Sequence, residues 1–178
     1  MSETKNEKRI LALDVRPRSF GYAVFEGPDQ LFDFGVRSFR KGVNAVKVPR
    51  GMKLEWLKED YLPSVIVLQA PGPRSKRRKF VAMVEVKAKR LGIAVRLLSD
   101  SAIQRAFAGE GRLTKYKIAC ALAERFPELR WSLPPKRKPW QSEDYRMSMF
   151  DAAALGVAYF ARSAKPAAES TPSDPAPP

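Results

Sequence analysis

The order of short apolar runs along the chain constrains the fold more than any other feature of the sequence. Five runs have the length and composition of β-strands, at residues 10–15, 21–25, 31–36, 64–68 and 93–98. Gly27-Pro28-Asp29 makes a tight turn between the second and third runs, so the first three strands are expected to pair antiparallel in sequence. The fourth run, Ser-Val-Ile-Val-Leu, is almost purely apolar, which is typical of a strand buried on both faces.

Segments with helical spacing separate and follow the later strands. They are expected at residues 43–61 (interrupted by Pro49-Arg50-Gly51), at 80–91, after the capping pair Asp100-Ser101, at 115–126 and at about 142–161. A helix between the fourth and fifth strands makes those two strands parallel. The pattern therefore predicts an α/β fold, with a five-stranded mixed sheet of three antiparallel and then two parallel strands, flanked by helices. We expect one domain at residues 9–163, between a flexible leader at 1–8 and a disordered Pro/Ala-rich tail at 164–178.

The composition excludes several classes of chemistry. The 178 residues include no histidine and a single cysteine, Cys120, which rules out a Ser-His-Asp triad, a Cys-His dyad, a histidine zinc site and a disulfide framework. Lys and Arg number 33 against 19 Asp and Glu, and this net charge of +14 indicates a polyanionic partner such as nucleic acid. On charge alone, a merely soluble basic protein is the open alternative. The sequence shows no membrane-spanning run and no secretory signal, so we expect a cytoplasmic, nucleoid-associated location.

Asp14 is the first candidate for a chemical role. An acid at the end of a buried strand is costly to keep charged unless a cation or hydrogen bonds meet it. Taken alone, the position is explained more simply by an aspartate that begins a turn.

Three segments, taken in order, change that interpretation. The first is Asp14-Val-Arg-Pro-Arg-Ser-Phe-Gly-Tyr-Ala-Val, which places an acid at a strand end before a short loop and a Gly-Tyr return strand. The second is Ala106-Phe-Ala-Gly-Glu-Gly-Arg-Leu-Thr-Lys, a Gly-x-Gly-Arg loop before a helix. The third is Met149-Phe-Asp-Ala-Ala-Ala-Leu-Gly-Val-Ala, an Asp before a run of small residues. In order and spacing they resemble the ribonuclease H-like fold and, within it, the RuvC-like junction endonucleases.

The resemblance implies a carboxylate cluster that holds two Mg²⁺ or Mn²⁺ ions, which activate a water and stabilise the leaving oxygen. Asp14 matches the first ligand position and Asp151 the last. Gln69 stands where the family has a Glu, and its neutral amide oxygen makes it a weak ligand. Ser148 stands where the family often has another acid. The implied catalytic positions are therefore Asp14, Gln69 and Asp151, with one ion, or none in an inactive relative.

Two further acids are candidates for an accessory role. Glu110 lies in the loop of the second segment, and Asp144 lies seven residues before Asp151. On one continuous helix that separation is roughly 11 Å, too far to share an ion. Asp144 and its neighbour Glu143 are therefore interpreted as acids that favour the helix N-terminus.

Basic residues gather beside the predicted acids. Several follow Gln69 directly, at the carboxyl end of a parallel strand, where ligands collect and phosphates would bind in a salt-dependent way. Trp140 either offers a stacking surface or is tucked into the core, and Trp131 is assigned to the core. The predicted nucleic-acid contacts are Arg16, Arg18, Arg74, Lys76, Arg77, Arg78, Lys79, Arg112, Lys115, Lys136, Arg137 and Lys138.

Two hypotheses for function follow from the resemblance. The first is a divalent-metal-dependent endonuclease that acts on branched or structured DNA, working as a homodimer because two symmetric cuts need two sites. The second is a catalytically inactive relative that binds DNA or RNA structurally, because Gln69 replaces the acidic ligand. An actin-like phosphotransferase is set aside, since it needs two lobes and this chain has residues for one.

Overall fold

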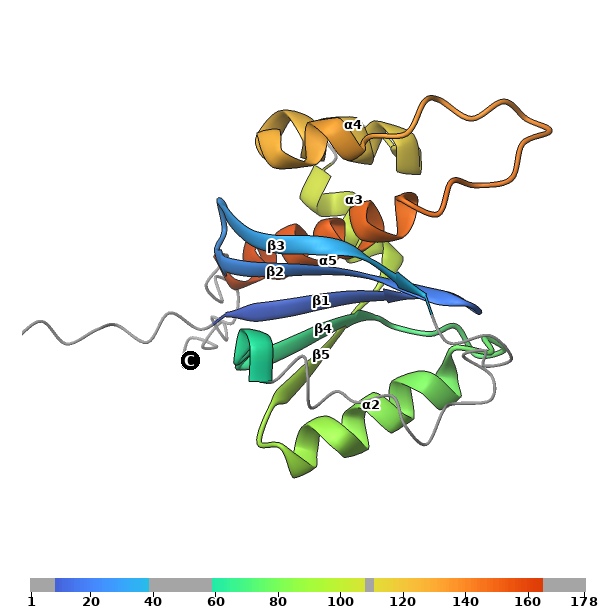
Figure 1. The fold of residues 1–178 in the computed structure, drawn as a ribbon. Helices are drawn as coiled ribbons and strands as arrows, with labels where there is room; N and C mark the ends of the chain where they lie inside the picture. The colour runs from blue at the N-terminus through green and yellow to red at the C-terminus, as the bar shows by residue number, and fades with distance from the viewer. Residues whose placement is uncertain (1–8, 39–58, 108–110, 165–178) are drawn as a thin grey trace, which may run out of the picture.

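A computed structural model describes residues 9–38, 59–107 and 111–164. They form a five-stranded sheet in the order β3-β2-β1-β4-β5 (Figure 1). Neighbouring strands pair antiparallel from β1 to β3, whereas β4 runs parallel to β1 and β5 runs parallel to β4. The predicted α/β fold class and its five-stranded mixed sheet are confirmed. The strands span Ile10–Val15 (β1), Ser19–Gly27 (β2), Gln30–Ser38 (β3), Val65–Gln69 (β4) and Ala94–Leu98 (β5).

Helices cover both faces of the sheet. α2 lies against one face, and α3, α4 and α5 lie on the other (Figure 1). The expected helix at 43–61 falls almost wholly outside the described residues, and only its end, 59–61, is seen to be helical. Across the described ranges, no helix combines the length and apolar character that a membrane crossing requires. The helices span Arg78–Arg90 (α2), Asp100–Phe107 (α3), Lys115–Arg125 (α4) and Met147–Ser163 (α5), with a 3-10 helix at Pro127–Ser132 (η1).

The alternation of side chains along β1 divides the core into two layers. Ile10 and Ala12 pack with residues of α3, α4 and α5, whereas Leu11 and Leu13 pack with Phe80 and its neighbours on α2. Successive side chains of a strand point to opposite faces, so Asp14 has the same orientation as Ile10 and Ala12. The fold therefore directs the one buried acid of β1 toward α5.

Helix α5 begins at Met147, and the prediction of a start near residue 142 was wrong. The carboxylate of Asp144 accepts the backbone N–H of Arg146, and its carbonyl accepts the N–H of Met147 at 3.1 Å. Such a local turn competes with helix formation. The helix therefore begins only at Met147, the first of the buried residues of α5. Residues 142–146 therefore approach the sheet as a loop, and Glu143 does not belong to the helix.

Glycine allows α5 to lie close to the sheet at two points. A Cβ atom on Gly21 of β2 would lie 2.1 Å from the backbone of Ser148, and one on Gly156 of α5 would lie 2.2 Å from the ring of Phe25. Both separations are far below van der Waals contact, so the close packing of α5 on β2 requires glycine at these positions. Because Gly21 pairs with Asp14 across the sheet, this packing brings the start of α5 next to the acid.

Candidate functional site

The candidate site lies where β1 and β4 end and α5 begins, at the right-hand end of the sheet in Figure 1. β1 supplies Asp14, the last residue of β4 is Gln69, and the first turns of α5 carry Ser148 and Asp151. Asp14 is 3 % exposed, and only one other polar residue, Ser148, is as deeply buried among the described residues. The structure thus brings together all the residues that the resemblance assigns to catalytic positions.

Ser148 fixes the orientation of Asp14. Its hydroxyl lies 3.1 Å from the carboxylate oxygen Oδ2 of Asp14 and 3.2 Å from the main-chain carbonyl of the same residue, and it donates to this pair of acceptors. A hydroxyl can meet a buried carboxylate in this way, whereas an acid at the same position would add a second negative charge. Ser148 therefore stabilises the buried carboxylate of Asp14 by a hydrogen bond and adds no charge to the cluster.

Arg16 occupies the centre of the acidic cluster. Its Nε donates to Asp14 Oδ2 at 2.9 Å, and one terminal nitrogen donates to Asp151 Oδ2 at 2.8 Å. The other terminal nitrogen donates to Oε2 of Glu143, in the loop before α5. One planar guanidinium thus joins carboxylates from three separate segments, and charge-assisted bonds of this kind are among the strongest in proteins.

Glu143 is the residue that the sequence reasoning failed to place in the site. The sequence pattern predicts it to be a helix acid, because the pattern places the start of α5 about five residues too early. In the loop that the Asp144 turn creates, its carboxylate reaches both Arg16 and Lys115. The Asp-x-Arg spacing of Asp144 and Arg146, which favours a local turn, is the signal that could have revealed the loop.

Two more cations complete the cluster. Lys115, in the first turn of α4, donates from Nζ to Asp151 Oδ2 at 2.8 Å and lies 3.6 Å from Glu143 Oε1. Arg77 lies 3.3 Å from the amide oxygen of Gln69 and 3.5 Å from Asp14 Oδ1. Three carboxylates and three cationic side chains therefore form one network.

The shifts in pKa follow from burial and from these neighbours. Burial, together with the charge of Asp14, raises the pKa of Asp151 above its ordinary value, although Lys115 and Arg16 act in the opposite direction. Burial alone would lower the pKa of Lys115, but the charges of Asp151 and Glu143 outweigh it and raise that pKa. The pKa of Arg16 is raised in the same manner, chiefly by Asp14, against the effect of burial. Both cations therefore stay charged at neutral pH.

The arrangement does not fit the pair of divalent ions that the resemblance implies. Mg²⁺ and Mn²⁺ need several oxygen ligands directed at one point, and such a group of acidic residues is absent from the parts of the chain that the structure describes. The carboxylate oxygens that face the centre of the cluster are already bound by Arg16 and Lys115. Gln69, at the end of β4, offers a single neutral oxygen that lies near Arg77.

The other predicted contact residues lie around the cluster. Arg18 is exposed in the loop after β1, and four exposed cations lie in the segment after β4 that leads into α2. One of them, Arg78, donates to the carbonyl of Pro73, while Arg112 donates to Asp100 at 2.9 Å. Asp144 pairs with Arg146 through its carboxylate. Glu110 lies outside the described residues. The four cations after β4 are Arg74, Lys76, Arg78 and Lys79.

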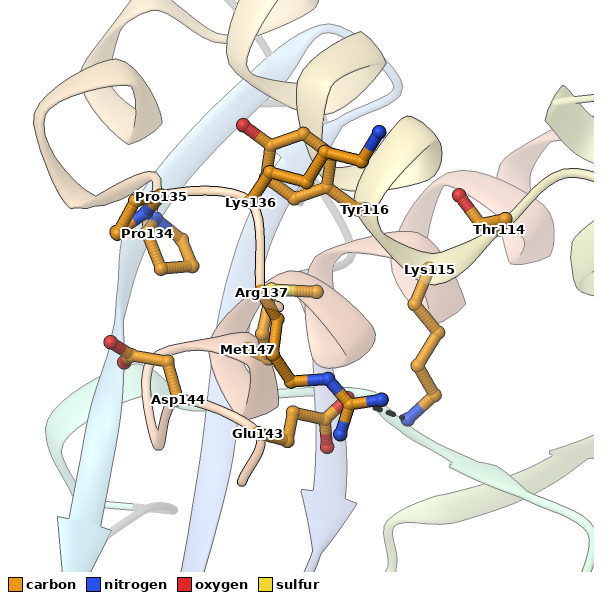
Figure 2. Close-up of a pocket in the computed structure, with 10 residues that line it drawn as sticks. All are labelled: Thr114, Lys115, Tyr116, Pro134, Pro135, Lys136, Arg137, Glu143, Asp144 and Met147. Atoms are coloured by element: carbon orange, nitrogen blue, oxygen red, sulfur yellow. Dashed lines mark ion pairs between the residues drawn. The ribbon is translucent and has the colours of Figure 1, made fainter. Parts of the chain in front are cut away.

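A hollow of about 400 Å³ opens beside the cluster, between the start of α4 and the loop before α5 (Figure 2). Lys115 and Glu143 line it on the side that faces the cluster, and Lys136 and Arg137 line it from the Pro-rich loop. Neither Lys136 nor Arg137 forms an ion pair with any acid in the described ranges. The hollow therefore presents uncompensated positive charge next to a neutralised acidic cluster.

Two tryptophans of the described chain are exposed. Trp140 is 78 % exposed, and Nζ of Lys138 lies 5.5 Å from the centre of its ring. The alternative in which Trp140 packs in the core is therefore wrong, and its ring is accessible for stacking. Trp131, in η1, is 92 % exposed, so its assignment to the core was also wrong. Core packing at η1 is provided by Leu129 instead.

Sheet order, strand directions and helix placement together define a ribonuclease H-like fold. RuvC of Thermus thermophilus has the same fold at a TM-score of 0.63 and 16 % identity, over 88 % of this chain and 96 % of that chain. The same protein in complex with a Holliday junction substrate gives a TM-score of 0.62 and 18 % identity, with the same coverage. The Fowlpox virus resolvase in complex with Holliday junction DNA gives a TM-score of 0.54 and 16 % identity, over 88 % and 99 %. No family model matches the sequence, and no curated protein sequence matches it.

Proposed function

We propose that this protein binds branched or structured DNA at the end of the sheet where β1 and β4 terminate, and that it does so without cutting the DNA. The observation that carries the proposal is the acidic cluster that Arg16, Lys115 and Arg77 neutralise, next to Lys136 and Arg137, which form no ion pair within the described ranges. A protein of this fold that has a basic surface, and whose carboxylates form internal ion pairs, is suited to bind phosphates.

The distribution of basic residues supports binding. Cations come from three segments that lie toward this end of the molecule: the stretch from β4 into the start of α2, the start of α4, and the Pro-rich loop before α5 (Figure 1). Contacts spread over three segments can follow phosphates on more than one strand, as a branched substrate offers. The Trp140 ring adds a surface on which an unpaired base can stack. The RuvC and Fowlpox virus resolvase structures contain Holliday junction DNA, which favours a junction as the first substrate to test.

A second candidate function is that of a metal-dependent endonuclease on the same DNA. Three separate segments bring Asp14, Glu143 and Asp151 to the guanidinium of Arg16, and this gathering of carboxylates favours the nuclease, because such chemistry uses carboxylates as metal ligands. This candidate needs Arg16 to leave the cluster when DNA binds. A pair of symmetric cuts at a junction would then require a second copy of the chain, because each cut needs its own site.

The test combines a gel shift and a cleavage assay on one labelled four-way junction, with linear duplex DNA and an RNA–DNA hybrid of equal length as competitors. Native protein, Asp14→Asn and Gln69→Glu are compared in EDTA, in Mg²⁺ and in Mn²⁺. We expect tight, salt-sensitive binding of the junction by all three proteins, and intact DNA in every lane. We expect Gln69→Glu to leave the DNA uncut, because its new carboxylate would pair with Arg77.

Metal-dependent cuts by the native protein that disappear in Asp14→Asn establish the nuclease instead. Cuts by Gln69→Glu alone assign the loss of catalysis to residue 69 and leave the binding proposal intact. Equal affinity for junction, duplex and hybrid contradicts selectivity for branched DNA. Absence of binding to every substrate overturns the proposed function altogether.

A further inference from the structure

We propose that the guanidinium of Arg16 is the resident cation of the acidic cluster and occupies the place that a divalent ion would need. The native protein then binds no Mg²⁺ or Mn²⁺ at this cluster. The inference rests on the proposed function only in its choice of site, since it concerns the cation and requires no DNA.

The geometry of the bonds carries the first part of the argument. Arg16 directs three nitrogens at Asp14, Asp151 and Glu143, so the three carboxylates are spread around the edge of one planar group. An ion such as Mg²⁺ requires its oxygens about 2.0–2.1 Å from one point in near-octahedral order. The nitrogen–oxygen distances of 2.8 and 2.9 Å to the two aspartates place the carboxylates around a guanidinium, which is larger than such an ion.

The balance of charge carries the second part. Asp14, Asp151 and Glu143 bring three negative charges, and Arg16, Lys115 and Arg77 bring three positive charges. No net negative charge is left to attract an ion. Removal of Arg16 leaves the cluster negative around an empty centre, with one of its acids, Asp14, almost fully buried. Uncompensated buried charge is strongly unfavourable, and a divalent cation is the natural replacement.

The loop after β1 holds Arg16 in this position. The backbone N–H of Arg16 donates to the carbonyl of Ser19 at 2.9 Å, which closes the short turn of the β1–β2 hairpin around Pro17. The side chain of Arg16 is 18 % exposed, because it points back into the cluster, whereas Arg18 in the same turn is exposed. The turn therefore provides a matched pair of arginines two residues apart, one inside the network and one outside it.

The experiment compares native protein with Arg16→Ala and with Arg18→Ala as the control. Binding of Mn²⁺ is measured by electron paramagnetic resonance of the free ion, and thermal unfolding is followed in EDTA and in 5 mM Mn²⁺. For the native protein and for Arg18→Ala, we expect no stoichiometric Mn²⁺ binding. We also expect the Tm of each of these two proteins to be the same in EDTA and in Mn²⁺. In EDTA, Arg16→Ala should unfold roughly 6–12 °C lower, as expected when one member of a buried ion network is removed. It should bind one Mn²⁺ and recover roughly half of that loss when the ion is added.

Stoichiometric Mn²⁺ binding by the native protein that is lost in Asp14→Asn overturns the inference, whether or not Arg16→Ala folds. A folded Arg16→Ala protein that gains no Mn²⁺ binding overturns it as well. Should that variant fail to fold, Arg16→Gln retains most of the side chain without its charge, and the same gain of one Mn²⁺ is expected. Because none of these measurements contains DNA, their failure is distinct from a failure to bind junctions in a gel shift.

Discussion

Replacement of Gly21 by alanine tests the packing on which the site depends. A Cβ atom at this position would lie 2.1 Å from both the carbonyl carbon and the carbonyl oxygen of Ser148, and 2.5 Å from the backbone nitrogen of Met149. Ordinary van der Waals contact begins near 3.4 Å, so the start of α5 would have to move by the difference, 1.3 Å. The obstructing atoms belong to backbone, and a change of rotamer cannot relieve the overlap.

The cost follows from what such a movement breaks. Overpacking of a core costs about 1–3 kcal/mol, and the upper end applies where backbone meets backbone. A shift of 1.3 Å away from β2 would also lengthen the hydrogen bond from Ser148 to Asp14, now 3.1 Å, beyond the bonding range. We therefore expect Gly21→Ala to lower the free energy of unfolding by about 3 kcal/mol and the Tm by about 6–12 °C.

Urea and thermal unfolding measure this loss, and Gly72→Ala provides the control. A Cβ at Gly72 meets no atom within 4 Å, so this second variant should remain within about 0.5 kcal/mol of the native protein. If the two variants unfold at the same urea concentration, α5 does not pack backbone against backbone on β2. The account of how Asp14 and Ser148 come together would then be incorrect.

Two further predictions concern charge. Lys136→Ala and Arg137→Ala should each reduce the slope of log affinity for junction DNA against log salt by about 1, while Lys89→Ala, near the far end of α2, leaves it unchanged. Equal slopes for these three variants would contradict the prediction that the hollow contacts DNA phosphates. Burial raises the pKa of Glu143, but Lys115 and Arg16 outweigh it and lower that pKa below its ordinary value of 4.5. The stability contributed by Glu143 is therefore present above pH 4.5 and is lost as the pH falls through its folded-state pKa. Urea unfolding between pH 3 and 7 should show a shallower acid loss for Glu143→Gln than for the native protein, and identical profiles would contradict the ion pairs of Glu143.

The fold could be predicted from local pattern because each strand and helix has a recognisable residue pattern within a short segment. The apolar run of β1, the tight turn after β2 and the spacing of α4 are properties of short segments, and their order leaves few topologies open. Asp14 and Asp151 could be singled out only through the resemblance to the RuvC-like family, which gives a ligand role to the acid at the strand end and to the acid before the run of small residues. The exposed cations after β4 follow from sequence alone as well.

The partners of those acids were decided by the tertiary structure. Arg16 had been predicted as a contact for DNA from its place after Asp14, yet its guanidinium bonds to residues 127 and 135 positions away. Glu143 joins the site only because a turn at Asp144 delays the start of α5, and periodicity locates such boundaries poorly. An ion pair depends on the three-dimensional path of the loops and on competition among all nearby charges. The sequence by itself therefore indicated two of the three clustered carboxylates, Asp14 and Asp151, and only the folded chain determined that Glu143 joins them and that arginine and lysine neutralise all three.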